Sequence, residues 1–426
     1  MKVLLLAYEW PPISAAQALR WYYLANGLAS RGVLVHVLCP DITSLPPYLV
    51  NSHPNVVEHR VWPGPFIGLA QALSGILLRP GEGASPGQKN IARSYLMRVY
   101  TAVRQLLDKI IYPDVRTEWY PFARRRLGRL LREHSFDVII SSHEPGVDLL
   151  LGLWAQKSGS LPWVVDMADP LCAPYAPRWR RWLDVWFEGL VLRRADRVIL
   201  TTDALRDVLL RRHRGLNFEK FATVAQGAPD APPASAGALW SKPGKLHIVF
   251  TGNFYRKFRN PDEFAKALRL LNSPEIAVTI AGENIHFAHL FSDVPDVTFL
   301  NRLEHFECLA LQGAADVLLN IGNTQDYQIP GKIFEYLVTG KAILHLRGSE
   351  SDPSEEVLRN FPLSFISDNS YKSIADILMQ LIRLWSHGEM GLNEFDVAEI
   401  KGRHGWSARS NSLKKILEDL SASRST

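Results

Sequence analysis

Short continuous apolar runs recur along the chain, and each is followed by a turn and a longer amphipathic stretch. The first run covers residues 3–7 and is broken by Pro11 and Pro12. Ser14 is a helix-capping residue type, so we expect a helix over residues 15–30, which Gly32 closes. Comparable runs lie at residues 33–38, 137–142, 162–166, 197–201, 246–250, 277–281, 297–300, 317–321 and 342–346. Strands that alternate with helices predict two Rossmann-like, doubly wound parallel sheets of the α/β class, which bind ligands at the carboxyl ends of their strands.

The strand pattern lapses between two halves of the chain. Residues 227–244 are rich in Pro, Ala, Ser and Gly, which is typical of a linker. We therefore predict a first domain over residues 1–228, a linker over 229–244 and a second domain over 245–395. A helical segment follows over 396–426, and its last helix, at 410–420, is expected to pack back on the first domain.

Composition narrows the class of protein. The chain has 426 residues, 47% hydrophobic and 21% charged, which indicates a globular protein of more than one domain. Its three cysteines (Cys39, Cys172 and Cys308) are far apart, which argues against a disulfide framework or a zinc site and favours a reducing compartment. The first apolar run is too short for a signal peptide, and no run reaches the roughly 18 residues of a membrane span. We expect a cytoplasmic protein with no nucleic-acid partner.

Basic residues are concentrated in the first half. Residues 1–230 carry 28 Lys and Arg against 20 Asp and Glu, whereas the remainder carries 20 against 23. Residues 61–125 fit the strand–helix pattern poorly and are interpreted as an insertion. Its expected helix over residues 92–111 carries Arg93, Arg98, Arg104 and Lys109, and an arginine-rich stretch follows over 124–132. The first half either meets an anionic partner, such as the inner face of the cytoplasmic membrane, or presents solvated helix faces. For the insertion, a surface helix pair that covers the sheet is slightly favoured over a membrane contact.

The strongest local signal is a loop, a short helix and a strand over residues 328–344. We expect Pro330 in the first turn of the helix and Gly331 beside a ligand. The free amides at the start of the helix and the charge of Lys332 suit a phosphate, and Glu335 suits sugar hydroxyls. The alternative is a capped helix with a solvated Lys332–Glu335 pair.

These residues resemble the donor motif of retaining GT-B glycosyltransferases of family four, in the branch that reads P-x-K-x-x-E-Y-L-x-x-G-K. The resemblance implies that Glu335 holds the nucleotide ribose. The segment 251–261 resembles the family's phosphate-binding loop, which implies donor contacts from Asn253 and a diphosphate contact from Arg259. Further similar segments lie at residues 8–12, 163–170, 195–198 and 297–317, so the resemblance covers most of the chain.

Three positions depart from the family pattern. A glutamate that contacts the donor sugar often stands where this chain has Tyr327. The paired glycines of the first loop are replaced by Ala15 and Ala16, and an arginine of the acceptor-side loop by Ala168. The identity of the donor sugar is therefore left open by the sequence.

Polar residues also follow the strands of the first half. His143 and Glu144 come after residues 137–142, where His143 is expected to position a sugar or move a proton, unless it only binds backbone. Asp169 follows the next strand beside Asp166 and is expected to orient an acceptor hydroxyl, unless it only shapes the turn before Pro170. The resemblance adds Glu9 and Arg20 on the acceptor side.

The sequence therefore predicts a GT-B protein with two Rossmann-like domains facing a cleft. The expected reaction moves a sugar from a nucleoside diphosphate sugar to a glycan or lipid-linked acceptor, with retention of configuration. No cofactor or metal is expected, because Arg259, Lys332 and the helix amides would stabilise the diphosphate. A role in surface polysaccharide assembly fits the basic first half. The alternatives are a GT-B-shaped nucleotide-sugar epimerase or hydrolase, and a catalytically silent relative that binds a glycan or a partner.

Overall fold

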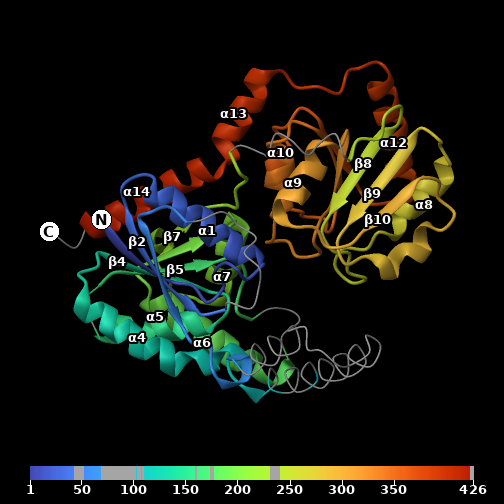
Figure 1. The fold of residues 1–426 in the computed structure, drawn as a ribbon. Helices are drawn as coiled ribbons and strands as arrows, with labels where there is room; N and C mark the ends of the chain where they lie inside the picture. The colour runs from blue at the N-terminus through green and yellow to red at the C-terminus, as the bar shows by residue number, and fades with distance from the viewer. Residues whose placement is uncertain are drawn as a thin grey trace, which may run out of the picture. The chain divides into compact units, whose positions relative to one another are not determined.

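The computed structural model describes residues 1–42, 52–68, 102, 107, 110–158, 161–172, 177–230 and 240–422. The chain divides into two compact units (Figure 1), which are described one at a time. The first unit comprises residues 1–200, 209–224 and 410–426, and the second comprises residues 201–208 and 225–409.

The first unit is built on a parallel sheet in the order β3-β2-β1-β4-β5-β6-β7. Its strands are β1 (Lys2–Leu6), β2 (Leu34–Pro40), β3 (Val56–Val61), β4 (Val138–Ser142), β5 (Trp163–Met167), β6 (Arg197–Leu200) and β7 (Phe221–Thr223). Strands β4 and β5 are buried along their whole length. The strand order reverses between β1 and β4, which is where a doubly wound sheet opens a crevice for a ligand.

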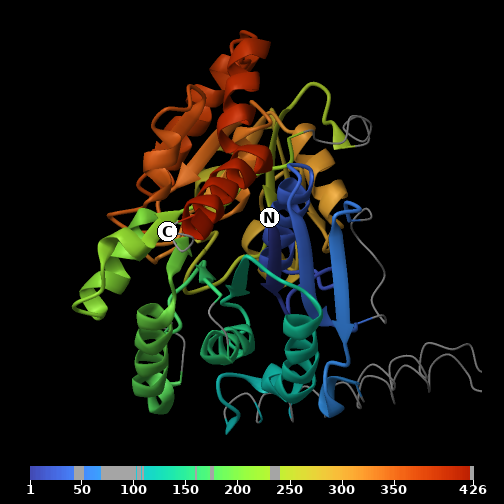
Figure 2. The ribbon, with the colours of Figure 1, turned by 90° about the vertical axis from the view of Figure 1, so that its left-hand side faces the viewer.

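Helices cover both faces of this sheet. They are α1 (Ala16–Ala29), α4 (Tyr120–Glu133), α5 (Val147–Ser158), α6 (Arg181–Arg194) and α14 (Trp406–Ala422), with 3-10 turns η1 (Val115–Trp119), η2 (Arg178–Arg180) and η3 (Phe218–Lys220). Helix α7 (Asp203–Arg212) is divided between the two units after Val208. Helices α4, α5 and α6 lie together on the side opposite α1 (Figures 1 and 2). Helix α14 passes from the second unit into the first and packs on α1, where a Cβ on Gly27 would lie 2.0 Å from Ser410 Oγ.

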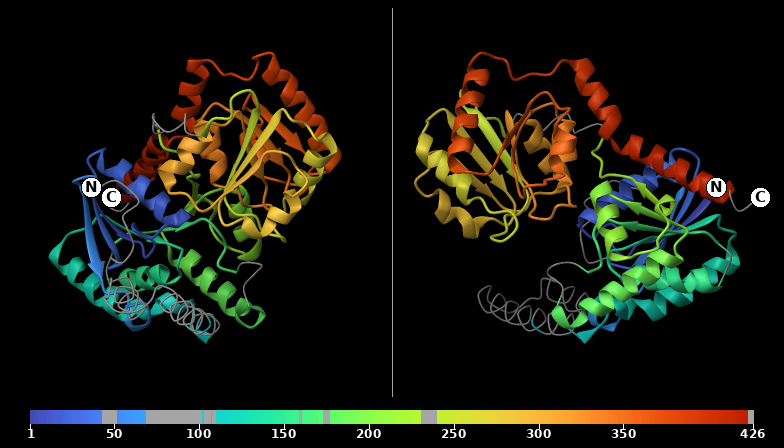
Figure 3. Two further views of the ribbon diagram at one scale, coloured as in Figure 1. Left: turned by 45° about the vertical axis from the view of Figure 1, so that its right-hand side comes forward. Right: turned by 180° about the vertical axis from the view of Figure 1, so that it is seen from behind.

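The second unit has a smaller parallel sheet in the order β10-β9-β8-β11-β12-β13. Its strands are β8 (Leu246–Thr251), β9 (Ile276–Ala281), β10 (Val297–Leu300), β11 (Val317–Ile321), β12 (Ala342–Leu346) and β13 (Ser364–Ser367). Its helices are α8 (Asp262–Leu271), η5 (Ile285–Phe291), α9 (His305–Gly313), α10 (Lys332–Leu337), α11 (Ser354–Leu358), α12 (Tyr371–Ser386) and α13 (Glu394–His404) (Figure 3). Val249 and Phe250, which are adjacent on β8, belong to separate apolar clusters. Both faces are therefore packed, which explains why the strands are continuous apolar runs.

The structure confirms every strand expected from those runs, with ends within two residues. It adds β3, β7 and β13, which the sequence analysis did not predict. All three are edge strands. One face of an edge strand is less deeply covered, so β3 mixes polar and apolar residues and β13 reads Ser-Phe-Ile-Ser.

One local expectation differs from the structure. The N-cap of α1 is Ala15, which makes no side-chain cap hydrogen bond, so the cap predicted at Ser14 is wrong. Ala228, just before the predicted linker, pairs with Gly405 in a parallel bridge, and both residues belong to the second unit. Most of the predicted insertion, including Arg93, Arg98, Arg104 and Lys109, lies outside the described residues, whereas the arginine-rich stretch at 124–132 falls in α4. Across the part of the chain that the structure describes, no helix has the length and apolar character needed to cross a membrane.

A histidine cluster closes the β2–β3 edge of the first unit. His36 Nδ1 lies 2.9 Å from His59 Nε2, and the ring of His134 packs edge-on against His36. Arg126 lies 3.1 Å from His59 Nδ1 and can only donate, so His59 donates its Nε2 proton to His36. Burial and the neighbouring imidazole lower the pKa of His36 to about 4, and burial and Arg126 lower the pKa of His59 to about 4.

Because both histidines are neutral in the folded state, we expect the first unit to lose stability as the pH falls. Unfolded histidine titrates at about pH 6.5, so the stabilisation is complete above that pH and is lost on descending toward the folded value. Urea unfolding at about pH 5 should give a free energy of unfolding about 1 kcal/mol lower than at about pH 7, after allowance for solvent screening of the half-buried His59. His59→Gln should reduce this difference, whereas His387→Gln, at an exposed histidine, should leave it unchanged. Equal pH dependence in wild type and His59→Gln would contradict the assignment.

Candidate functional site

The carboxyl edge of the second sheet gathers the residues expected to bind the donor. The strand order reverses between β8 and β11, so the loops that follow these two strands meet at one edge. The loop after β8 carries Asn253 and Arg259, and the loop after β11 carries Asn323, Tyr327 and Gly331. Tyr327 is half-buried in its loop.

Two glycines allow the loop after β8 to pack closely on the loop after β9. Gly252 and Gly282 have φ values of +146° and +140°, and a Cβ on Gly282 would lie 2.1 Å from the Gly252 carbonyl oxygen. Asn253 Oδ1 accepts a hydrogen bond from the Glu283 amide at 2.9 Å, and Asn284 binds the backbone of the same loop. The start of the loop is therefore rigid, and Asn253 already serves to hold it.

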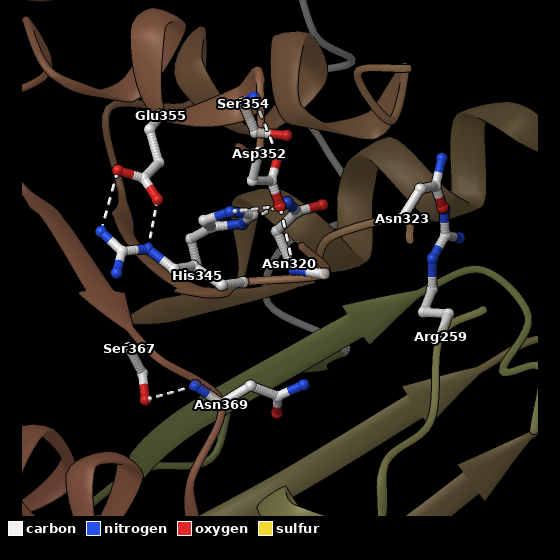
Figure 4. Close-up of polar contacts among 11 residues, drawn as sticks. Arg259, Asn320, Asn323, His345, Asp352, Ser354, Glu355, Ser367 and Asn369 are labelled. Atoms are coloured by element: carbon white, nitrogen blue, oxygen red, sulfur yellow. Dashed lines mark hydrogen bonds and ion pairs between the residues drawn. The ribbon is translucent and has the colours of Figure 1, made fainter. Parts of the chain in front are cut away.

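Arg259 is a cation without an anionic partner. Its NH2 group donates to Asn323 Oδ1 at 2.8 Å (Figure 4), and its Nε is buried and has no hydrogen-bond partner. Within the described ranges, no carboxylate lies within 4 Å of it. Burial lowers the pKa of Arg259, since it disfavours the charged form. A largely buried guanidinium with one neutral partner has donors left for an anion.

Glu335 stands on α10 at the centre of a second polar network. Its Oε2 accepts from Lys332 Nζ at 2.7 Å and from Gln312 Nε2 at 2.9 Å. Gln312 also binds Thr251 at the end of β8. Burial would raise the pKa of Glu335, but the charges of Lys332 and His305 hold it below its ordinary value. Glu335 is thus a buried carboxylate, and its Oε1 accepts from no described residue, which leaves it open to a ligand hydroxyl.

The start of α10 differs from the sequence-based expectation. The helix begins at Lys332 with Gly331 as N-cap, so Pro330 precedes the cap instead of occupying the first turn. The amides of Ile333 and Phe334 already donate to Pro330 and Gly331. Lys332 is paired with Glu335, and Glu335 is buried while Lys332 stays partly exposed. Arg259, and not the amides of this short helix, is therefore the group in the site that lacks a counter-charge.

A buried network that the sequence analysis missed supports the loop carrying Asn323. His345 on β12 accepts from Asn320 Nδ2 at 2.7 Å through Nδ1, and its Nε2 lies 3.2 Å from Asp352 Oδ2 (Figure 4). Burial would raise the pKa of Asp352, but His345 and backbone amides hold it at about 2. A Cβ on Gly322 would lie 2.0 Å from Asp352 Oδ2, so the loop is pressed against this carboxylate. A histidine inside an apolar strand was the signal available in the sequence.

In the first unit, Arg20 is part of the framework. It is fully buried, and its Nε and NH2 groups bind both oxygens of Asp166, at 3.0 and 2.8 Å. It also donates to the Val224 carbonyl, and Gln17 binds the same carboxylate. This bidentate pair joins α1 to β5, so neither Arg20 nor Asp166 presents a charge to a ligand.

A pocket of about 460 Å³ in the first unit brings His143, Glu144 and Asp169 together. Arg116 and Arg180, which the sequence analysis did not select, also line it. His143 Nδ1 accepts from the Ala168 amide at 3.3 Å, so a neutral imidazole carries its proton on Nε2. The sequence left open that His143 only binds backbone. Its Nδ1 does accept a hydrogen bond from a backbone amide, but the residue also lines the pocket.

Glu9 lies beside this group, buried and 3.4 Å from Arg116. Burial and the nearby Glu144 raise the pKa of Glu9 to about 7, against the opposing charge of Arg116. Asp148 is fully buried and accepts a hydrogen bond from the Tyr8 amide, and burial raises its pKa well above the ordinary value. The described residues hold no group of three His, Cys, Asp or Glu side chains suited to a metal ion.

Comparison with known proteins identifies the fold. Residues 16–227 match the model of the glycosyl transferase 4-like domain. No curated protein sequence matches the chain. The structure is similar to sucrose-phosphate synthase from Thermosynechococcus elongatus, with 14% identity, coverage of 99% of this chain and 100% of that chain, and a TM-score of 0.70.

Two further solved structures are similar along almost the whole chain. HepE from Anabaena, in complex with UDP and glucose, has 13% identity, covers 98% of this chain and 100% of its own, and gives a TM-score of 0.62. A putative UDP-N-acetylglucosamine 2-epimerase from Listeria monocytogenes has 10% identity, with coverage of 98% and 97% and a TM-score of 0.57. The fold is GT-B, with two parallel-sheet α/β domains.

The buried pair of Arg20 and Asp166 predicts a large stability effect. Arg20→Met leaves Asp166 buried without its partner, so urea unfolding should show a loss of about 3–5 kcal/mol in the first unit. The matched control Arg60→Met, at the part-exposed pair with Glu58, should cost about 1 kcal/mol or less. The double variant Arg20→Met/Asp166→Leu should recover much of the loss. If Arg20→Met left stability unchanged, Arg20 would not be the framework residue described above.

Proposed function

We propose that this GT-B chain, whose residues 16–227 match the glycosyl transferase 4-like domain, is a glycosyltransferase that moves a sugar from a nucleoside diphosphate sugar to an acceptor hydroxyl. The observation that carries the proposal is that one sheet edge holds both a cation without a counter-charge and a carboxylate that can accept a hydrogen bond. Arg259 is a largely buried cation without a carboxylate, and Glu335 is a buried carboxylate with an open oxygen. A nucleoside diphosphate has an anionic end and a ribose with hydroxyl donors, so it satisfies both.

Arg259 would stabilise the charge that grows on the diphosphate as the bond to the sugar breaks. A fixed guanidinium needs no reorganisation at that moment, and in a partly dehydrated site its effect is larger than in water. Asn323 holds it from the side, and Gln328 in turn binds Asn323. Lys332 adds a second positive charge near Glu335. We propose that Arg259 and Lys332 stabilise the leaving diphosphate without a metal ion.

In the first unit, His143, Glu144 and Asp169 would serve the acceptor and the reacting sugar. The Nε2 proton of His143 is available to a sugar oxygen, and the two carboxylates suit hydroxyl donors. We propose retention of configuration on the basis of the donor-motif resemblance. A glycan or lipid-linked acceptor, as in surface polysaccharide assembly, is supported by the basic first half of the chain.

One alternative is favoured by a specific observation. The similarity to a putative 2-epimerase keeps open a reaction of the nucleotide sugar alone, in epimerisation or hydrolysis. Glu9, with a pKa of about 7, is a carboxyl group suited to proton transfer near neutral pH. Rapid conversion of the donor without acceptor would favour this alternative, and acceptor-dependent release of the nucleoside diphosphate would favour transfer. A silent relative, suggested by Tyr327, would bind neither UDP nor GDP.

Glu335→Ala should remove nucleotide binding, because it deletes the acceptor expected to hold the ribose. A thermal-shift screen should show stabilisation of the wild type by UDP or GDP and by the matching nucleoside at higher concentration. Glu335→Ala should lose both shifts, since the ribose is common to both ligands. The control Glu418→Ala, at an exposed pair with Lys414, should keep both. An unchanged shift in Glu335→Ala would place the nucleotide elsewhere, and no shift by any nucleotide in the wild type would refute the proposed function.

A further inference from the structure

Three tryptophans are exposed on one short segment of the first unit. Trp179, Trp182 and Trp186 have 52%, 70% and 58% of their surface exposed, in η2 and the first turns of α6. By contrast, Trp10, Trp21, Trp119 and Trp163 are fully buried. Trp182 and Trp186 are four residues apart, so they lie on the same side of the helix. Exposed indoles grouped in this way indicate a surface with a partner.

The inner side of α6 is accounted for by packing. Phe187, Val191 and Leu192 are buried against the first unit, so the helix is anchored by its apolar inner face. The three tryptophans are exposed and are not among these buried positions. Their exposure is therefore not a consequence of poor packing of the helix.

All exposed charges of this segment are positive. Arg178, Arg181, Arg193 and Arg194 are exposed. The two carboxylates, Asp184 and Glu188, are buried and neutralised by their neighbours. Asp184 pairs with Arg180, and Glu188 with Arg212 and His213. The surface of η2 and α6 is thus made of indoles and guanidinium groups, with no exposed acid.

A second cationic helix lies on the same side of the sheet. Helices α4 and α6 are the neighbours of α5, and all three lie opposite α1 (Figures 1 and 2). Arg124, Arg125 and Arg129 of α4 are exposed, and so is Phe122. Exposed arginines are therefore present on α4 as well as on the segment that carries the tryptophans.

We propose that the tryptophan face, defined as Trp179, Trp182 and Trp186, docks on a lipid bilayer that carries anionic headgroups. Indole rings settle in the headgroup region, where the ring is in an apolar environment and the N–H group is hydrated. Arginine stems lie along the helix while the guanidinium groups bind lipid phosphates. A symmetric contact with a second copy would bring arginines against arginines, which opposes self-association. Single-stranded nucleic acid is bound in grooves that stack successive bases, and the tryptophan face does not belong to the pocket of the first unit.

Docking of this kind does not depend on the transfer reaction. It would place the first unit at the surface where a lipid-linked acceptor resides, but a protein without transferase activity would bind vesicles equally well. Failure of the vesicle experiment would therefore leave the proposed function unaffected. Failure of nucleotide binding would likewise leave the membrane proposal unaffected.

The test is sedimentation of the full chain with vesicles of phosphatidylcholine, with and without phosphatidylglycerol. The wild type should sediment with the anionic vesicles, more weakly at high salt, and only slightly with the neutral ones. Trp182→Ser/Trp186→Ser should lower the affinity at least about tenfold. Because both side chains are exposed, the thermal midpoint of the variant should match the wild type. Lipids brominated near the headgroup should quench the fluorescence of the wild type more strongly than that of the variant, which keeps only Trp179 of the tryptophan face.

Phe395→Ser is the matched control, since it removes an exposed aromatic residue from α13 and should leave vesicle binding unchanged. Equal vesicle binding by wild type and the double tryptophan variant would overturn the proposal. So would the absence of binding to anionic vesicles at low salt. Tryptophan-dependent dimerisation, or tryptophan-dependent binding of single-stranded RNA in place of vesicles, would assign the tryptophan face to another partner.

Discussion

The central constraint in the second unit is a largely buried positive charge that the protein does not neutralise. Removing a guanidinium from water is costly unless it is paired, and such groups are normally paired with carboxylates. Arg259 has one neutral partner, Asn323, which is held by Gln328. The loop around Asn323 is fixed in turn by Gly322, Gly348 and the Asp352 carboxylate. The surrounding fold keeps Arg259 in this state, which is the arrangement of a site prepared for an anion.

In the first unit, by contrast, buried arginine and carboxylate side chains are paired with each other. Arg20 and Asp166 neutralise each other in a bidentate pair, and Glu188 is paired with Arg212 and His213. At the pocket, Glu144 stands near Glu9, whose pKa is raised to about 7. The two units thus offer complementary chemistry, with a reserved cation in one and acids with a histidine in the other. This division fits a donor with a diphosphate and an acceptor with hydroxyls.

The pattern of apolar runs predicted the central strands, which are buried on both faces, and also the apolar edge strand β10. It missed the edge strands β3, β7 and β13, whose residues are partly polar. The residues expected to bind the donor were selected through the motif resemblance, and the structure brings Arg259, Lys332 and Glu335 to the same sheet edge. The pairing partners were not predictable in this way. Neither the Lys332–Glu335 pair nor the burial of Arg20 is visible in sequence spacing, because each depends on which face of a helix meets the sheet. Asp352 and His345 were missed because their partners are distant in the chain.

The most direct measurement is calorimetric titration of wild type and Arg259→Met with UDP or GDP, whichever binds, and with its nucleoside. If Arg259 is reserved for the diphosphate, the variant should bind the diphosphate about a hundredfold more weakly, in line with loss of a charge-assisted contact worth about 2–3 kcal/mol. It should bind the nucleoside as the wild type does and, without ligand, be at least as stable, because methionine needs no counter-charge. Unchanged affinity for the diphosphate, or an equal loss for diphosphate and nucleoside, would contradict the account.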